Sequence, residues 1–206
     1  MTLSDDIKLY LPKYLSEEGT RELLKNLKQF PNNIDSRFYT RIPLDKEVLL
    51  QGDGFLDGFP VTNLPESEIK SNIPVIIISN TCDNDENNNR KTPRPFVSYC
   101  PIVNFQKFEN MLFKKFPNER DSISSILESI KKQMVTNILF LPAYQNGLKY
   151  DGIVFFDKII SSNAEIISIG QIPEKRLFSL SDYGFYVFLF KLSIHFTRIQ
   201  ENVSRS

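Results

Sequence analysis

The chain has 206 residues, of which 41% are hydrophobic and 12% aromatic, which suits one globular domain with appendages or at most two small domains. Its 25 basic and 25 acidic side chains give a formal net charge of zero, so no overall positive field attracts nucleic acid, and any RNA contact must come from a local basic patch. Residues 1–13 lack the apolar core of a signal peptide, and the apolar run at 185–190 is too short to span a bilayer, so we expect a protein that makes no membrane contact.

Residues 1–47 are expected to form an arm followed by a helix. Ser16 is a good N-cap, Glu17 and Glu18 favour the first turn, and Pro31 ends the helical spacing. The connection from 32 to 43 then alternates basic and aromatic residues, namely Arg37, Phe38, Tyr39 and Arg41. This alternation suits single-stranded RNA, whose bases stack on aromatic rings. It equally suits a connection whose aromatic side chains anchor it to the domain, which is the interpretation we favour.

Residues 48–172 contain the predicted strands. The four consecutive β-branched residues from Val75 to Ile78 predict a strand, and because the apolar run does not alternate with polar residues, this strand should be buried on both faces. We expect strands at 48–61, 73–80, 96–102, 138–141 and 152–157, and a further strand at 166–169.

Helical patterns interrupt and follow these strands. Apolar residues at helical spacing predict two helices in an insertion at about 105–135, separated at Pro117, with Asp121 as the N-cap of the second. The C-terminal segment, 173–206, should contain a helix from Tyr183 to about Gln200. Because this helix is apolar on nearly every side, we expect it to be buried or to lie at an interface.

The order of four segments along the chain indicates a family. They are the turn Leu49-Leu50-Gln51-Gly52-Asp53-Gly54-Phe55, the strand ending at Ser79-Asn80, the strand ending at Pro101-Ile102, and the turn and strand from Gly147 to Ile159. In this order they resemble the MazF/PemK-like toxin family, over about residues 48–160. The resemblance implies a mostly antiparallel, SH3-like β-barrel. With helices added at the N-terminus, in the insertion and at the C-terminus, the expected fold class is α+β.

The resemblance also implies a function. It suggests a prokaryotic cytoplasmic protein of a toxin–antitoxin or phage-defence system, which forms a homodimer and acts on single-stranded RNA or is held by an antitoxin-like protein partner. A MazF-like ribonuclease needs no metal and no cofactor. It cleaves RNA by in-line attack of the 2′-hydroxyl on its own phosphate, so the protein must move a proton and stabilise the developing charge.

In the family, an Arg just before the central strand and a Ser or Thr just after the Pro-Ile strand carry that work. Here the central strand is preceded by Lys70-Ser71-Asn72, and the Pro-Ile strand is followed by Val103-Asn104. Arg94 could supply the cation from the start of the second strand, or it could be an ordinary loop residue. Arg94 and Asp83 are therefore the candidate catalytic residues.

Asp53, Asn80, Thr81 and Lys70 are the candidates for binding RNA or another ligand. The polar residues that follow a buried strand often line a site. Asp53 could orient a cation or a ribose hydroxyl, but an Asx-turn after Gly52 explains it by itself, and we favour that interpretation.

The cysteines and the single histidine are not expected to be catalytic. Cys82 and Cys100 end neighbouring predicted strands, and without a Cys-x-x-Cys spacing they do not indicate a metal site. We expect two reduced thiols that lie near each other. His195 lies on the last helix beside Phe196 and is expected to be a core or interface residue.

Two hypotheses of function follow. The first is an endoribonuclease, with Arg94 and the polar residues at 80–83 near the scissile phosphate. The second is a non-catalytic protein-interaction module that has kept the barrel and lost the ribonuclease residues. The missing Arg and Ser or Thr favour the second hypothesis.

Overall fold

The computed structural model describes residues 16–41, 47–63, 66–70, 72–85, 96–166 and 169–197. The helices in chain order are α2 (Glu17–Gln29), α3 (Thr81–Asn84), α4 (Phe105–Lys115), α5 (Arg120–Lys131), α6 (Ile172–Lys175) and α7 (Asp182–Thr197), with short 3₁₀ turns η1 (Ser36–Phe38), η2 (Ala164–Ile166) and η3 (Ile169–Gln171). The strands are β1 (Gly54–Phe55), β2 (Val61–Asn63), β3 (Glu66–Lys70), β4 (Val75–Ile77), β5 (Val97–Asn104), β6 (Ile138–Leu141), β7 (Gly152–Phe155), β8 (Ile160–Ser162) and β9 (Arg176–Phe178). None of the described helices has the length and apolar character needed to cross a membrane.

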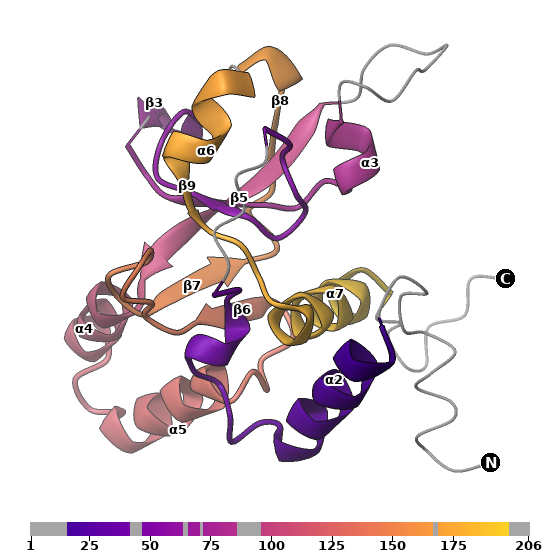
Figure 1. Ribbon diagram of the computed structural model, residues 1–206. Coiled ribbons are helices and arrows are strands. Elements are labelled where there is room, and N and C mark those ends of the chain that lie inside the picture. The colour runs from indigo at the N-terminus through magenta and orange to yellow at the C-terminus, as the bar shows by residue number, and fades with distance from the viewer. Residues whose placement is uncertain are drawn as a thin grey trace, which may run out of the picture.

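A seven-stranded sheet forms the centre of the molecule. Its strands follow the order β6-β7-β5-β4-β1-β9, with β8 beside β5, and every pairing among the described strands is antiparallel. β5 joins the two halves, because one of its edges pairs with β4 and the other pairs first with β8 and then with β7. The sheet curls between its layers of helices (Figure 1), so the fold is α+β as expected. β2 and β3 form a separate two-stranded sheet.

The central strand is buried on both faces, as its sequence predicts. All four residues from Val75 to Ile78 are at most 8% exposed. Ile76 and Ile78 belong to the core beneath α7, whereas Val75 and Ile77 belong to a second core with Phe55 and Phe59. Successive strand residues point to opposite faces, so both cores depend on this one register.

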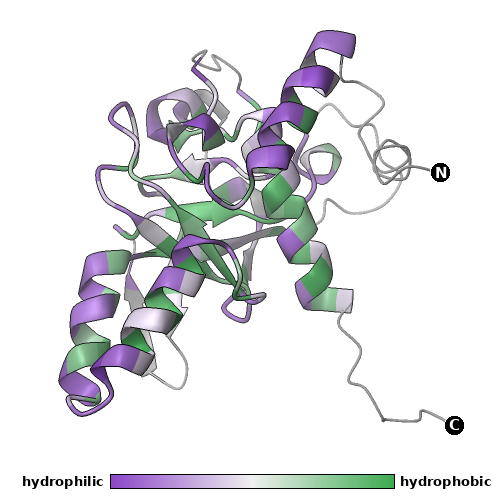
Figure 2. Ribbon diagram, turned by 90° about the horizontal axis from the view of Figure 1, so that it is seen from below, coloured by the Kyte–Doolittle hydropathy of each residue, from purple (hydrophilic) through white to green (hydrophobic). Residues whose placement is uncertain are grey.

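α7 lies against one face of the sheet, and α2 lies beside α7 (Figure 1). Most of α7 is hydrophobic and most of α2 is hydrophilic (Figure 2), because α7 packs between the sheet and α2. The expected cap of α2 is confirmed, since the Gly19 amide donates to Ser16 Oγ at 3.0 Å. The expected burial of α7 is confirmed at Phe188, whose side chain is fully buried, although Phe190 and Phe196 are 56% and 61% exposed.

α4 and α5 cover the opposite face beside β6 and β7. The apolar side chains of this third core come from both helices and both strands: Phe105, Ile123, Leu127, Ile130, Ile138, Phe140 and Ile153. The two helices expected in this segment are therefore confirmed. Its second helix begins at Arg120, so Asp121 lies in the first turn and is not the N-cap, and its carboxylate there still interacts favourably with the helix dipole.

Two strand predictions are wrong in detail. Of the first strands expected within 48–61, residues 48–50 form no strand, and the one expected from Gly54 to Val61 is broken, because the chain turns between β1 and β2 at Gly58, whose φ is 92°. In place of a strand at 166–169, Ile166 ends η2 and Ile169 begins η3. The sequence also missed β3, β8 and β9, because these short strands contain polar or charged residues and lack a continuous apolar run.

Candidate functional site

A cavity of about 520 Å³ opens where β4 ends, and we call it the Asp53 cavity. Three segments form its walls: the turn before β1, the start of α3, and the connection from β9 into α7. The lining residues are Leu50, Gln51, Asp53, Asn80, Thr81, Cys82, Ser179, Leu180, Asp182, Phe185 and Leu189. The turn and α3 supply mainly polar groups, and α7 supplies an apolar wall.

The Asp53 cavity brings together three of the residues expected to bind a ligand. Asp53, Asn80 and Thr81 all line it, although the first is far from the other two in sequence. Asp83 follows on α3 but does not line the cavity, and Lys70 ends β3 in the separate two-stranded sheet. Arg94 lies in the segment 86–95, outside the described residues.

Asn80 and Thr81 also hold the chain where it leaves β4. The Asn80 side chain caps α3 by accepting a hydrogen bond from the Cys82 amide at 2.8 Å. Thr81 Oγ1 accepts from the Gln51 amide at 3.0 Å, which ties α3 to the turn before β1. The buried Asn84, which the sequence did not single out, donates to the Leu49 carbonyl at 3.2 Å and strengthens the same link. The run of polar residues after β4 therefore serves as a turn as well as a cavity wall.

Asp53 forms a buried ion pair with Arg176 at the back of the cavity. Arg176 Nε lies 2.8 Å from Asp53 Oδ2, and the two side chains are 5% and 2% exposed. Arg176 Nη2 also donates to the Val48 carbonyl at 2.5 Å. Burial raises the pKa of Asp53 to about 6, and the charge of Arg176 opposes this rise. Asp53 therefore pairs with Arg176 in addition to its hydrogen bond with the Leu50 amide in the turn.

The described lining of the Asp53 cavity carries carboxylates and no lysine or arginine. Asp53 is neutralised by Arg176 behind it, whereas Asp182 is an exposed residue at the start of α7. Burial, and then the neighbouring Glu22, raise the pKa of Asp182. These charges suit a cationic or hydrogen-bond-donating ligand and disfavour a phosphate.

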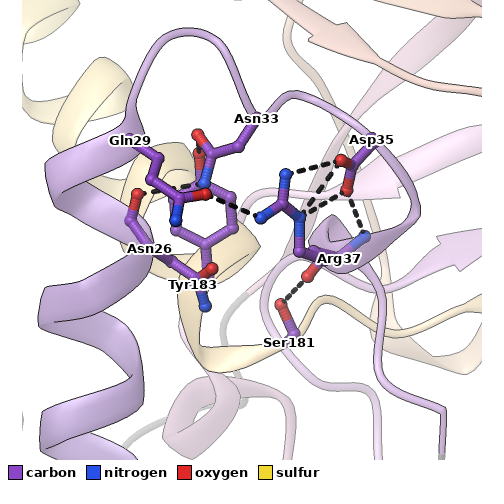
Figure 3. Close-up of polar contacts among 7 residues, drawn as sticks. All are labelled: Asn26, Gln29, Asn33, Asp35, Arg37, Ser181 and Tyr183. Carbon is purple, nitrogen blue, oxygen red and sulfur yellow. Dashed lines mark hydrogen bonds and ion pairs between the residues drawn. The ribbon is translucent and has the colours of Figure 1, made fainter.

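A second cavity, of about 630 Å³, adjoins the first, and Leu180 and Asp182 line both. Arg37 and Arg41 line this second cavity. The Arg37 guanidinium is held in place (Figure 3): Nε lies 2.9 Å from Asp35 Oδ1, and Nη1 donates to Gln29 Oε1 at 3.0 Å. The hydrogen bond from Arg37 lowers the pKa of Asp35, so this cation is already paired.

The aromatic residues beside Arg37 anchor the 32–43 connection. Phe38 is fully buried and Tyr39 is 2% exposed, with the Tyr39 hydroxyl donating to the Pro142 carbonyl at 2.6 Å. Ser181 Oγ donates to the Arg37 carbonyl at 2.5 Å and fixes the connection to the start of α7 (Figure 3). The anchor interpretation is confirmed, and neither ring is available for stacking on a base.

The cysteines and the histidine occupy different settings. Neither cysteine forms a disulfide: Cys82 is exposed in the cavity wall, and Cys100 lies in the core, where burial raises its pKa to about 12. The ring of His195 packs against Phe156 and Phe196, as expected for a core or interface residue. Among the residues with described positions, no group of His, Cys, Asp and Glu side chains is arranged to hold a metal ion.

Comparison of the sequence with models of protein families gives no match, and comparison with curated proteins gives none either.

Proposed function

We propose that this chain is a divergent MazF/PemK-like barrel protein of a prokaryotic toxin–antitoxin or phage-defence system, which has lost the ribonuclease residues and acts as a protein-interaction module. The Asp53 cavity then receives a basic side chain of an antitoxin-like protein partner. The charge of the cavity carries this proposal, because its described lining offers carboxylates, amides and two hydroxyl groups and no lysine or arginine. Cleavage of RNA by in-line attack requires the opposite, a cation facing the scissile phosphate.

The sheet supports the barrel part of the proposal. All its described strand pairs are antiparallel, and it curls around the core beneath α7 (Figure 1). The segment Pro101-Ile102 lies in β5, beside β4, as the resemblance implies for the two central strands. We propose an SH3-like barrel within residues 48–172, extended at its edge by β9, which pairs with β1.

The surroundings of the cavity support partner binding without RNA cleavage. Asn80 and Thr81 are hydrogen-bonded within the turn, and Arg176 is buried against Asp53. Phe38 and Tyr39, the aromatic residues that could have stacked on bases, lie in the core.

The lining also indicates the chemistry of the partner segment. The exposed Asp182 can pair with a guanidinium or ammonium group, and Phe185 and Leu189 form an apolar wall beside it. A segment with one arginine flanked by leucines matches both features. In line with the resemblance, we also propose a homodimer, for which the exposed Phe196 on α7 offers apolar surface.

Peptide binding tests the proposal. In fluorescence anisotropy, a labelled Leu-Arg-Leu peptide should bind the wild type more tightly than a Leu-Glu-Leu peptide. Asp182→Asn should weaken binding of the arginine peptide by up to about fivefold, the effect of a surface ion pair of ~1 kcal/mol. Asp121→Asn is the matched control, since Asp121 also lies exposed in the first turn of a helix, and should bind as the wild type does.

Two results would count against the proposal. One is equal binding of the two peptides, or an equal loss in both variants. The other is cleavage of a long single-stranded RNA by the wild type in EDTA, which would favour the endoribonuclease hypothesis.

A further inference from the structure

A third cavity, of about 480 Å³, lies between α2, α7 and the turn at 133–136, and it shares no lining residue with the Asp53 cavity. We call it the Lys191 cavity. Its lining residues are Leu27, Phe30, Gln133, Met134, Thr136, Tyr186, Val187, Phe190, Lys191 and Ile194. Most of this wall is apolar, and the volume is within the range of about 300–1,000 Å³ that small-molecule sites usually have.

One charged side chain lies in this apolar wall. Lys191 is 4% exposed, and its Nζ donates to the carbonyl oxygens of Gln133 and Val135, each at 2.8 Å. An ammonium group has three N–H donors. In the part of the chain that the structure describes, these two carbonyls are its hydrogen-bond acceptors, so one N–H is left for a ligand.

The carbonyl of Gln133 is held toward Lys191 by an unusual backbone conformation. Gln133 has a φ of 61°, a left-handed conformation that costs a residue other than glycine about 1–2 kcal/mol. Its buried side chain stabilises this conformation by binding both backbone groups of Phe140: Nε2 donates to the carbonyl at 2.5 Å, and Oε1 accepts from the amide at 3.1 Å. The polar end of the cavity is therefore rigidly built.

We propose that the Lys191 cavity binds a small amphiphilic carboxylate, with its aliphatic or aromatic tail against Phe30, Val187 and Phe190 and its carboxylate accepting a hydrogen bond from Lys191. A buried ammonium is costly without a countercharge, and a carboxylate supplies one. A neutral lipid would leave that charge uncompensated. A phosphate needs several donors, and beside Lys191 the described wall is mainly apolar.

The charge on Lys191 makes binding depend on pH. Burial lowers the pKa of Lys191 to about 7, so the ammonium form is favoured below that pH. Among the described lining residues, Tyr186 on α7 is the other group that titrates, and burial raises its pKa. The residues of α2 and of the 133–136 turn that line the cavity do not titrate. Carboxylate binding should therefore weaken from pH 6 to pH 8.

Methyl NMR of methionine tests the proposal directly. The chain has three methionines, of which Met134 lines the cavity and Met111 lies on α4, outside it. With ¹³C-methyl methionine, decanoate at pH 6 should shift the Met134 signal saturably and leave the Met111 signal unchanged. Decanoate should bind about tenfold more tightly than decanol, which has the same tail and no charge, and this ratio should fall at pH 8.

Lys191→Met removes the charge with little change in volume, and Lys107→Met, at an exposed position on α4, is the matched control. We expect Lys191→Met to bind decanoate and decanol equally, and Lys107→Met to keep the preference for decanoate. If Lys191→Met fails to fold, Ile194→Glu should weaken decanoate more than decanol, because it adds a like charge to the wall.

Three results would overturn the proposal. They are the absence of a saturable Met134 shift with decanoate, a preference for decanoate that persists in Lys191→Met, and a Met134 shift that depends on protein concentration alone. The last would mean that a second copy of the chain occupies the cavity.

Discussion

Arg176 Nε lies 2.8 Å from Asp53 Oδ2, and neither side chain is more than 5% exposed. Asp53 precedes β1 and Arg176 begins β9, so the antiparallel pairing of these two strands brings the charges together. The pair therefore connects the last strand of the sheet to the wall of the Asp53 cavity. Removing one member should leave the other charge buried without a partner.

Asp53→Asn should lower the free energy of unfolding by about 3–5 kcal/mol, the usual cost of breaking a buried ion pair. Urea denaturation measures this loss. The control is Lys175→Met, which removes the neighbouring pair between Lys175 and Asp57, 3.2 Å apart and partly exposed. That change should cost less than about 1 kcal/mol. Equal losses in the two variants would show that the burial of Asp53 adds nothing.

Lys191 should make stability depend on pH. Burial lowers its pKa from 10.5 to about 7, so between these values the unfolded chain binds more protons at this site than the folded protein. The contribution of Lys191 to stability therefore rises with pH across this window. We expect the unfolding free energy of the wild type, minus that of Lys191→Met, to increase from pH 7 to pH 10. A constant difference would contradict the lowered pKa.

Phe188→Asp should unfold or strongly destabilise the protein. Phe188 lies on α7, and its side chain is fully buried in the core. Burying an unpaired carboxylate there costs several kcal/mol, comparable with a domain's total stability of about 5–15 kcal/mol. Ser193→Asp, at an exposed residue of the same helix, is the control and should melt close to the wild type. Circular dichroism measures the melting temperature of both variants. If Phe188→Asp melts at the wild-type temperature, Phe188 is not packed in the core.

Gly184→Ala should destabilise the protein, although alanine usually favours a helix over glycine by about 1 kcal/mol. A Cβ at Gly184 would lie 2.2 Å from the carbonyl oxygen of Phe38, so α7 would have to move away from the chain it contacts. At Gly170 an added Cβ meets nothing within 4 Å, and Gly170→Ala should be nearly neutral. Chemical denaturation of both variants tests this contact. If Gly184→Ala is more stable than the wild type, the close contact between α7 and Phe38 does not exist.

Arg94 tests the ribonuclease hypothesis. If the wild type cleaves single-stranded RNA in EDTA, Arg94→Ala should reduce the rate by about 10²–10³-fold, because it removes the cation expected near the phosphate. The melting temperature should stay nearly unchanged, since the sequence around Arg94 is typical of a solvated loop. Cleavage that needs a divalent metal, or that survives the substitution, would place the chemistry elsewhere. The protein-interaction proposal expects no cleavage by the wild type.

Local patterns in the sequence were sufficient where an element has a continuous apolar run or a clear capping residue. The apolar run at 75–78 predicted a strand buried on both faces, Ser16 predicted the start of α2, and the segment 138–141 predicted β6. In each case the signal is a continuous apolar run or a capping residue, which can be recognised without knowing the tertiary neighbours.

The sequence also predicted ligand-binding roles for Asp53, Asn80 and Thr81, and tertiary structure placed all three in one cavity. It gave no sign of Arg176, because one arginine between a lysine and a leucine is typical of a surface position. The left-handed Gln133 and its contact with Lys191 were equally hidden. Both pairs join residues from distant parts of the chain. Their charges and conformations are determined by burial and strand pairing, which no local pattern encodes and which only the folded chain decides.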